Sequence, residues 1–177
     1  MRAASRLVLL CALAFTVVLA GCAGPLKSPP GTTTTVILIR HAERLHLSDD
    51  LNDDGRVRAA ALPAAVADLN IAAIYSPNLQ RNINTIRPLA EQRGIEIVIA
   101  DPMAVPERMI AERPGQVVLW VGNTTNLGNI MGRLGGEGDP PNTYGDIYIL
   151  TIPDDDCQAS LRPLRPDCVS RVPRRET

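Results

Sequence analysis

The chain is poor in aromatic residues, with one Trp, three Tyr and one Phe among 177 residues. Proteins that bind single-stranded nucleic acid stack its bases on aromatic rings, so this scarcity argues against that class. An excess of positive charge is also missing, because the formal net charge is −1. The chain therefore offers no basic surface for DNA or RNA, and we expect no nucleic-acid partner. The length and overall composition of the chain are typical of one globular domain with an aliphatic core.

The N-terminus has the pattern of an export signal. Two arginines precede an uncharged apolar run over residues 7–20, which is short for a bilayer span of roughly 20 residues. The run ends in Leu19-Ala20-Gly21-Cys22 and resembles a bacterial lipoprotein signal. The resemblance implies a signal peptide over 1–21, a lipid on Cys22, and a location on the periplasmic face of the cell envelope. An uncleaved anchor helix and an unlipidated secreted protein are the alternatives.

Composition divides the rest of the chain into three parts. Residues 22–34 are rich in Gly, Pro, Ser and Thr and predict a flexible tether. A folded domain is expected over 35–155, followed by a Pro- and Arg-rich tail over 156–177. In an exported protein, Cys157 and Cys168 of this tail are expected to form a disulfide, with two free thiols as the alternative. Two isolated cysteines are too few for a zinc site, and no motif indicates a metal or another cofactor.

Strand and helix patterns alternate along the domain. The predicted strands cover 34–39, 72–75, 95–100, 116–121 and 146–152. The predicted helices cover 53–70, 79–93 and 127–134, and 104–113 is a short helix or a loop. In the first helix, apolar residues at helical spacing are Val57, Ala61, Ala65 and Leu69. The order predicts an α/β fold, a three-layer sandwich with a mostly parallel central sheet flanked by helices.

Polar residues follow three of these strands. They are Arg40-His41, the segment 76–81, and Asn123-Thr124. Functional groups of open parallel sheets gather beyond the carboxyl ends of the strands. We therefore expect the functional site at this edge of the sheet.

Five segments resemble motifs of the histidine phosphatase superfamily, which also contains the cofactor-dependent phosphoglycerate mutases. They are V-I-L-I-R-H-A-E-R (36–44), L-N-D-D-G-R-V-R-A-A-A-L (51–62), I-Y-S-P-N-L-Q-R-N-I-N-T-I-R-P-L-A (74–90), V-V-L-W-V-G-N-T-T-N-L (117–127) and Y-G-D-I-Y-I-L-T-I (144–152). The resemblance covers residues 35–152 in the right order and spacing. It implies a phosphoglycerate mutase-like fold.

The resemblance assigns the central chemistry to three residues. His41 would attack phosphorus and form a phosphohistidine that water later hydrolyses. Arg40 and Arg81 would bind the phosphoryl oxygens, because the planar guanidinium group can bind two oxygens at once. The alternative for His41 is a structural histidine at a strand end. His46 has no motif around it and is expected on a surface loop.

Three carboxylates and one further arginine are candidates for supporting roles. Glu43 could hold the arginines of the site in place, or it could be a solvated loop residue. Arg58 is expected to pair with a carboxylate rather than to contact substrate. A general acid is needed to protonate the leaving oxygen. Glu107 is the best candidate for it, and Glu112 is the second.

Asn123 is a departure from the motif, which has a second histidine here. An amide can donate a hydrogen bond to a phosphoryl oxygen, but it carries no charge. Losing one such stabilising donor typically lowers the rate by on the order of 10²–10³. Thr124 beside it is expected to be a further neutral donor to the substrate.

Two functions therefore remain open. The first is a lipid-anchored envelope phosphatase that hydrolyses small phosphomonoesters through His41. The second is a catalytically degenerate envelope lipoprotein that binds phosphate or a phosphorylated ligand. A phosphoglycerate mutase is disfavoured, because the chain looks exported and lacks room for the longer insertions. The short connection between Arg81 and Gln116 leaves little material for a lid and predicts an open site. The sequence indicates no oligomeric state.

Overall fold

The computed structural model describes residues 24–46 and 48–154. Their elements are β1 (Thr34–Arg40), α2 (Asp53–Ala65), β2 (Ile71–Ser76), α3 (Gln80–Arg93), β3 (Ile97–Ile99), α4 (Val105–Glu112), β4 (Val117–Gly122), α5 (Thr124–Arg133) and β5 (Ile147–Ile152). The strands form one sheet in the order β3-β2-β4-β1-β5. Only β5 pairs antiparallel among these strands, so the prediction of a mostly parallel sheet is confirmed.

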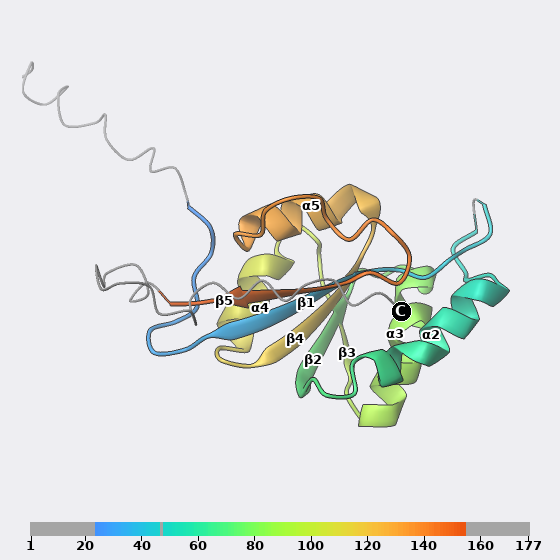
Figure 1. Cartoon of the computed structure of the whole chain (residues 1–177), viewed down its shortest axis with the longest axis horizontal. Coiled ribbons are helices and arrows are strands. Elements are labelled where there is room, and N and C mark those ends of the chain that lie inside the picture. Colours follow the sequence, from blue (N-terminus) through green and yellow to red (C-terminus); the bar gives the residue numbers. More distant parts are fainter. Residues whose placement is uncertain (1–23, 47, 155–177) are drawn as a thin grey trace, which may run out of the picture.

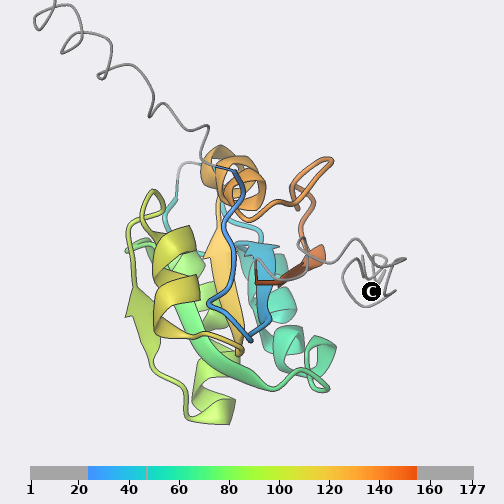
Figure 2. The same cartoon turned by 90° about the vertical axis from the view of Figure 1, so that its left-hand side faces the viewer.

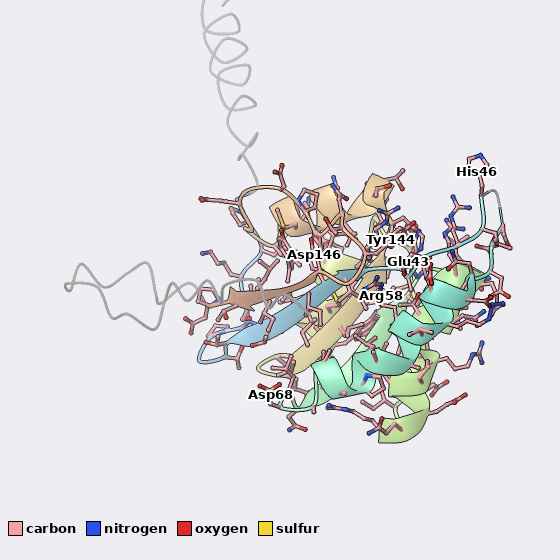
Figure 3. All side chains as sticks on the ribbon, turned by 45° about the vertical axis from the view of Figure 1, so that its right-hand side comes forward. Glu43, His46, Arg58, Asp68, Tyr144 and Asp146 are labelled. Carbon is pink, nitrogen blue, oxygen red and sulfur yellow. The ribbon has the colours of Figure 1, made fainter. Side chains whose placement is uncertain are left out.

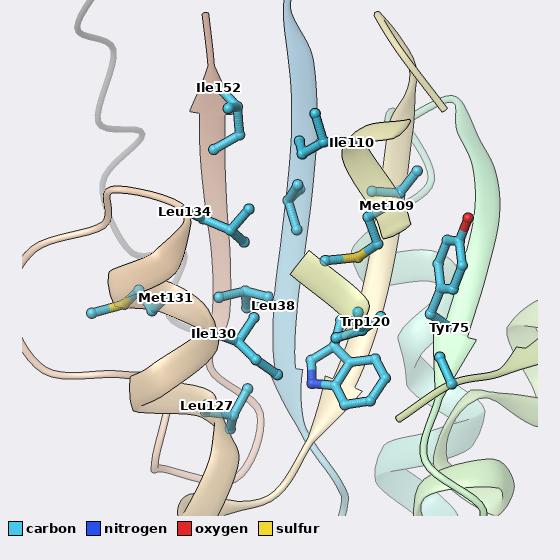
Figure 4. Close-up of a cluster of buried hydrophobic side chains, with 14 of the residues drawn as sticks. Leu38, Tyr75, Met109, Ile110, Trp120, Leu127, Ile130, Met131, Leu134 and Ile152 are labelled. Atoms are coloured by element: carbon cyan, nitrogen blue, oxygen red, sulfur yellow. The ribbon is translucent and has the colours of Figure 1, made fainter. Parts of the chain in front are cut away.

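Helices cover both faces of the sheet, as the two views of Figures 1 and 2 show. On one face, Leu62 of α2 and Leu89 of α3 pack on alternate residues of β1 and β4. On the other face, Met109 of α4 and Ile130 of α5 close the second core, which surrounds Trp120 (Figure 4). The central strands are thus buried on both sides, which explains their nearly continuous apolar sequences.

The first helix differs from its prediction in length and in its buried face. Asn52 caps it by accepting a hydrogen bond from the Gly55 N–H at 2.9 Å, but the helix ends at Ala65 rather than residue 70. Beyond Val66, hydrogen bonds between residues three apart, such as that from the Ala67 N–H to the Ala64 carbonyl, replace the helical pattern. Its buried residues are Gly55, Ala59, Leu62 and Pro63. Val57, which was predicted on the apolar face, is 72% exposed. Alanines lie on several sides of α2, so helical spacing alone does not identify the side that is buried.

The other boundaries deviate by a few residues. The predicted strand 95–100 shortens to three residues, and 104–113 is a helix over Val105–Glu112. The last helix begins at Thr124 rather than at residue 127, immediately after β4. Gly94 ends α3 as expected, with a φ of 64° in the left-handed region that glycine adopts readily.

The segment before β1 is attached to the domain, which corrects the prediction of a flexible tether over 22–34. The Leu26 N–H donates to the carbonyl of Arg133 at 2.8 Å, and the Leu26 side chain packs against the core under α5. The Ser28 hydroxyl donates to the Ile152 carbonyl at 2.7 Å. Within the described residues, only those before Leu26 are therefore left for a tether.

Several predictions fall outside the described residues. They concern the signal peptide 1–21, the lipid on Cys22, and the tail 156–177 with its disulfide between Cys157 and Cys168. Among the residues that the structure does describe, no helix has both the length and the apolar character needed to cross a membrane.

Gly55 lies where the start of α2 approaches the segment after β1. A Cβ atom here would come closer than 3.0 Å to the carbonyl oxygen of Glu43, a main-chain atom that cannot turn aside. We expect Gly55→Ala to lower the free energy of unfolding by about 1–3 kcal/mol, the usual cost of overpacking. Urea denaturation followed by circular dichroism measures this loss.

Gly132 provides the matched control for this substitution. It is exposed on α5, and a Cβ atom there would have no atom within 4 Å. Gly132→Ala should stabilise the protein by roughly 0.5–1 kcal/mol, because alanine favours the helix. Equal effects of the two substitutions would contradict the steric explanation.

Candidate active site

His41 lies immediately after β1, and its side chain is nearly enclosed. Its backbone N–H donates to the Gly122 carbonyl at 3.0 Å, which fixes it against the end of β4. Its ring atom Nδ1 lies 2.7 Å from the Ala42 carbonyl oxygen. A carbonyl only accepts, so Nδ1 carries the proton of a neutral ring and Nε2 keeps its lone pair. The ring is therefore oriented as a nucleophile requires.

The surroundings favour the neutral form of this histidine. Burial lowers the pKa of His41, against the opposing effect of the Ala42 carbonyl, and the positive charges of Arg81 and Arg40 lower it further. A cationic imidazole has no lone pair for attack. The lowered pKa thus keeps the nucleophilic form available at neutral pH.

The two predicted phosphate-binding arginines lie at this edge of the sheet, and both have internal partners. Arg40 Nη1 donates to the Asn142 carbonyl at 2.6 Å. Arg81 Nη1 donates to Asp49 Oδ1 at 2.5 Å, and the other carboxylate oxygen of Asp49 accepts from the Gln80 N–H at the start of α3. Asp49 therefore occupies a position where an anion would meet both an arginine and a helix N-terminus.

Two side chains of α3 that were not among the predicted site residues hydrogen-bond the backbone at the ends of β1 and β4. The Thr85 hydroxyl accepts from the Ala42 N–H at 2.8 Å and donates to the Arg81 carbonyl at 2.7 Å. The Asn82 amide donates to the Val121 carbonyl at 3.1 Å. Both residues belong to the segment that carries Arg81, so the motif contained the signal for them.

Glu43 and Arg58 form an ion pair rather than contacting the phosphate-binding arginines. Arg58 Nε donates to both carboxylate oxygens of Glu43, at 3.0 and 2.8 Å. These hydrogen bonds lower the pKa of Glu43 and raise that of Arg58. The pairing of Arg58 with a carboxylate agrees with the prediction, but Glu43 holds α2 in place instead of Arg40 or Arg81.

The predicted general acids lie elsewhere. Glu107 forms an ion pair with Arg133 at the far end of α5. Glu112 accepts from Arg108 Nε at 2.7 Å and from the Tyr75 hydroxyl at 3.0 Å. No described contact links either carboxylate to His41, so the assignment of Glu107 to the catalytic group is corrected.

Asn123 reaches the site, whereas Thr124 is exposed beside it. Asn123 Oδ1 accepts from Arg81 Nε at 3.3 Å. This bond leaves the amide Nδ2 of Asn123 as the group that could donate to a phosphoryl oxygen. Thr124 is the first residue of α5, and its side chain has no described hydrogen bond.

The site is less open than predicted, because a segment near the C-terminal end of the domain's sequence covers it. His41 is only 4% exposed. The ring centroid of Tyr144, just before β5, lies 6.0 Å from that of His41. Figure 3 shows Tyr144 above Glu43 and Arg58, and His46 far out on its exposed loop. The cover thus comes from the residues before β5 and not from the short connection after Arg81.

A groove of about 750 Å³ begins beside this cover and runs between α2 and β5. Arg40 and Glu43 line one end of it, and Val57 and Ile147 line its apolar walls. In the described part of the chain, no group of three or more His, Cys, Asp or Glu side chains is arranged to hold a metal ion. The groups that this edge brings together are the imidazole of His41 and the nearby guanidinium groups of Arg40 and Arg81.

A family model supports this interpretation over the first part of the domain. The model of the histidine phosphatase superfamily, branch 1, matches residues 36–104. The matched segment includes His41, Arg40 and Arg81 and ends before Asn123. No curated protein matches the chain significantly.

Solved structures resemble the whole domain at low sequence identity. The protein histidine phosphatase SixA in complex with tungstate is 16% identical, has a TM-score of 0.57, and covers 68% of this chain and 89% of its own. YhfR from Bacillus stearothermophilus is 19% identical at a TM-score of 0.55, over 66% and 90% of the two chains. The alpha-ribazole phosphatase from Shigella flexneri is 17% identical at a TM-score of 0.51, over 65% and 89%. These similarities establish a shared fold.

Proposed function

We propose that this chain, which matches the histidine phosphatase superfamily model over residues 36–104, is a member of that superfamily and hydrolyses phosphomonoesters through a phosphohistidine at His41. One observation carries this proposal. The Nδ1 atom of His41 is held by the Ala42 carbonyl at 2.7 Å, and Arg40 and Arg81 are close enough to lower the pKa of the ring. An imidazole that keeps the lone pair on Nε2 and has two positive charges nearby suits attack on a phosphoryl group.

The reaction proceeds in two displacements. Nε2 of His41 attacks phosphorus in line, an N–P bond forms, and the bond from phosphorus to the leaving oxygen breaks. Arg40 and Arg81 bind the phosphoryl oxygens as charge shifts onto them. A water molecule then attacks the phosphohistidine, the N–P bond breaks, and inorganic phosphate leaves with His41 restored.

The leaving oxygen must depart as an anion or take its proton from water. Both predicted general acids, Glu107 and Glu112, are engaged with other residues. Esters of acidic alcohols such as p-nitrophenol can be cleaved without a general acid, because their leaving group is stable as an anion. We therefore expect aryl phosphates to be better substrates than alkyl phosphates.

The proposal includes a location in the bacterial cell envelope. The pattern Leu19-Ala20-Gly21-Cys22 supports removal of the leader and attachment of a lipid to Cys22. The enzyme would then act on the periplasmic side of a membrane. Metabolic labelling with a palmitate analogue, compared with Cys22→Ser, tests this part separately from the chemistry.

A second function is supported by Asn123. A neutral amide in place of a cationic donor is expected to slow transfer more than it weakens ground-state binding. The protein would then bind phosphate or a phosphorylated ligand without turning it over at a useful rate. Tungstate, found in the complex of SixA, is a suitable probe of such binding.

Trapping the phosphoryl-enzyme tests the enzymatic proposal. The purified full chain is mixed with p-nitrophenyl phosphate and quenched in alkali, where phosphohistidine survives, and the labelled peptide is identified by mass spectrometry. We expect one phosphoryl group on His41, prevented by tungstate. As pH is lowered, kcat/KM should fall with a midpoint below the ordinary imidazole pKa of 6.5, because the pKa of His41 is lowered. Tungstate binding with neither labelling nor turnover would leave the binding function instead.

A further inference from the structure

The guanidinium group of Arg40 is held by the segment that precedes β5. Its carbon Cζ lies 4.0 Å from the ring centroid of Tyr144, within the range of a cation–π contact. Its Nη2 donates to the Tyr144 hydroxyl at 3.1 Å, and its Nη1 donates to the Asn142 carbonyl at 2.6 Å. Tyr144 therefore contacts Arg40 through both its ring and its hydroxyl group.

The same tyrosine lies beside the nucleophile. The ring planes of Tyr144 and His41 are inclined by 58°, with centroids 6.0 Å apart. Arg40 and His41 are neighbours in the chain, whereas Tyr144 lies 104 residues beyond Arg40. Tyr144 thus connects the segment before β5 to both Arg40 and His41.

An arginine binds an oxyanion well only if its planar group already points toward it. A free arginine side chain samples many rotamers, and fixing them at the moment of binding weakens affinity. The contacts with Tyr144 and Asn142 fix the guanidinium plane beforehand. They use two of its N–H groups, and Arg40 Nε has no hydrogen-bond partner among the described residues.

From these contacts, we propose that Tyr144 is a positioning residue that orients Arg40 for the phosphoryl group. The inference rests on the proposed function only in taking this edge of the sheet as the phosphoryl site. The segment before β5 would then contribute to substrate affinity, a role that the motif around Arg40 does not indicate.

Graded substitutions of Tyr144 test the proposal through tungstate binding, measured by calorimetry on the purified full chain. Tyr144→Phe keeps the ring and loses the hydroxyl, so we expect a loss of affinity of about threefold. Tyr144→Leu loses both contacts and should bind roughly tenfold more weakly. The KM for p-nitrophenyl phosphate should rise in the same order, with a smaller change in kcat.

A double-mutant cycle separates positioning from general destabilisation. If Tyr144 acts through Arg40, Tyr144→Leu should have little further effect on tungstate affinity in Arg40→Lys, whose ammonium group cannot stack in the same plane. Tyr148→Leu is the matched control. Tyr148 lies on β5 and packs against the core on the α5 side, so its loss should lower the melting temperature and leave tungstate affinity unchanged.

The outcomes distinguish this inference from the proposed function. Unchanged affinity in Tyr144→Leu, or the same loss in both backgrounds, would overturn the positioning role while the phosphoryl site stands. A wild-type protein that fails to bind tungstate would overturn both. Binding without turnover in the wild type contradicts only catalysis, and the graded series then still tests Tyr144.

Discussion

Replacing His41 with alanine should lower kcat for p-nitrophenyl phosphate by roughly 10⁴-fold or more, because removal of a catalytic nucleophile usually has an effect of that size. The only other histidine, His46, lies on an exposed loop and cannot replace it. Phosphate release followed by molybdate colorimetry measures the loss. We expect no trapped phosphoryl group on the variant.

Two controls separate chemistry from folding in this experiment. His41 is 4% exposed, so alanine leaves a small cavity, and the melting temperature must be compared with that of the wild type. Added imidazole should restore part of the activity by entering that cavity. His46→Ala should behave like the wild type. Equal rates for wild type and His41→Ala would mean that the hydrolysis does not pass through His41.

Replacing Asn123 with histidine should raise kcat by on the order of 10²-fold, the usual contribution of a charged donor to a developing oxyanion. The position suits the change, because Asn123 Oδ1 already lies 3.3 Å from Arg81 Nε and the residue precedes the N-terminus of α5. The new imidazole would gain its proton when the phosphoryl group binds. Initial rates with p-nitrophenyl phosphate over a range of pH measure the gain.

The pH dependence gives this prediction a second readout. Arg81 and the helix N-terminus both lower the pKa of an imidazole at this position. The gain should therefore be largest at mildly acidic pH and vanish as pH rises through that pKa. Asn129→His, on the exposed side of α5, is the control and should change neither rate nor profile. A variant slower than wild type at every pH would mean that the amide itself is needed beside Arg81.

The sequence was sufficient to predict the order of the five strands, though not all of their ends, and the edge of the sheet where the candidate site forms. Buried parallel strands require continuous β-branched and aliphatic runs, and such runs stand out against polar loops. The register pairs Arg40 with Gly122, so the ends of β1 and β4 coincide. This geometry follows from parallel pairing and brings His41 to Asn123 without any knowledge of the helices.

The sequence was insufficient where long-range packing decides. Val57 and Leu62 both fit a helical period in an alanine-rich segment, and only docking of α2 determines that Leu62 is buried. Glu107 pairs with Arg133 of another helix, and none of the sequence motifs indicates this contact. Tyr144 contacts Arg40 across 104 positions, a separation at which sequence spacing carries no signal.

The attachment of the segment before β1 limits how the domain could be placed on a bilayer. If Cys22 carries a lipid, the four residues to Leu26 reach at most about 14 Å. Leu26 is bonded to the end of α5, whereas Asn123 begins that helix about 15 Å away. The catalytic edge would then point outward into the aqueous compartment. Phosphorylated metabolites that diffuse in this compartment would reach the groove lined by Arg40, while headgroups of the same leaflet would lie beneath the opposite pole.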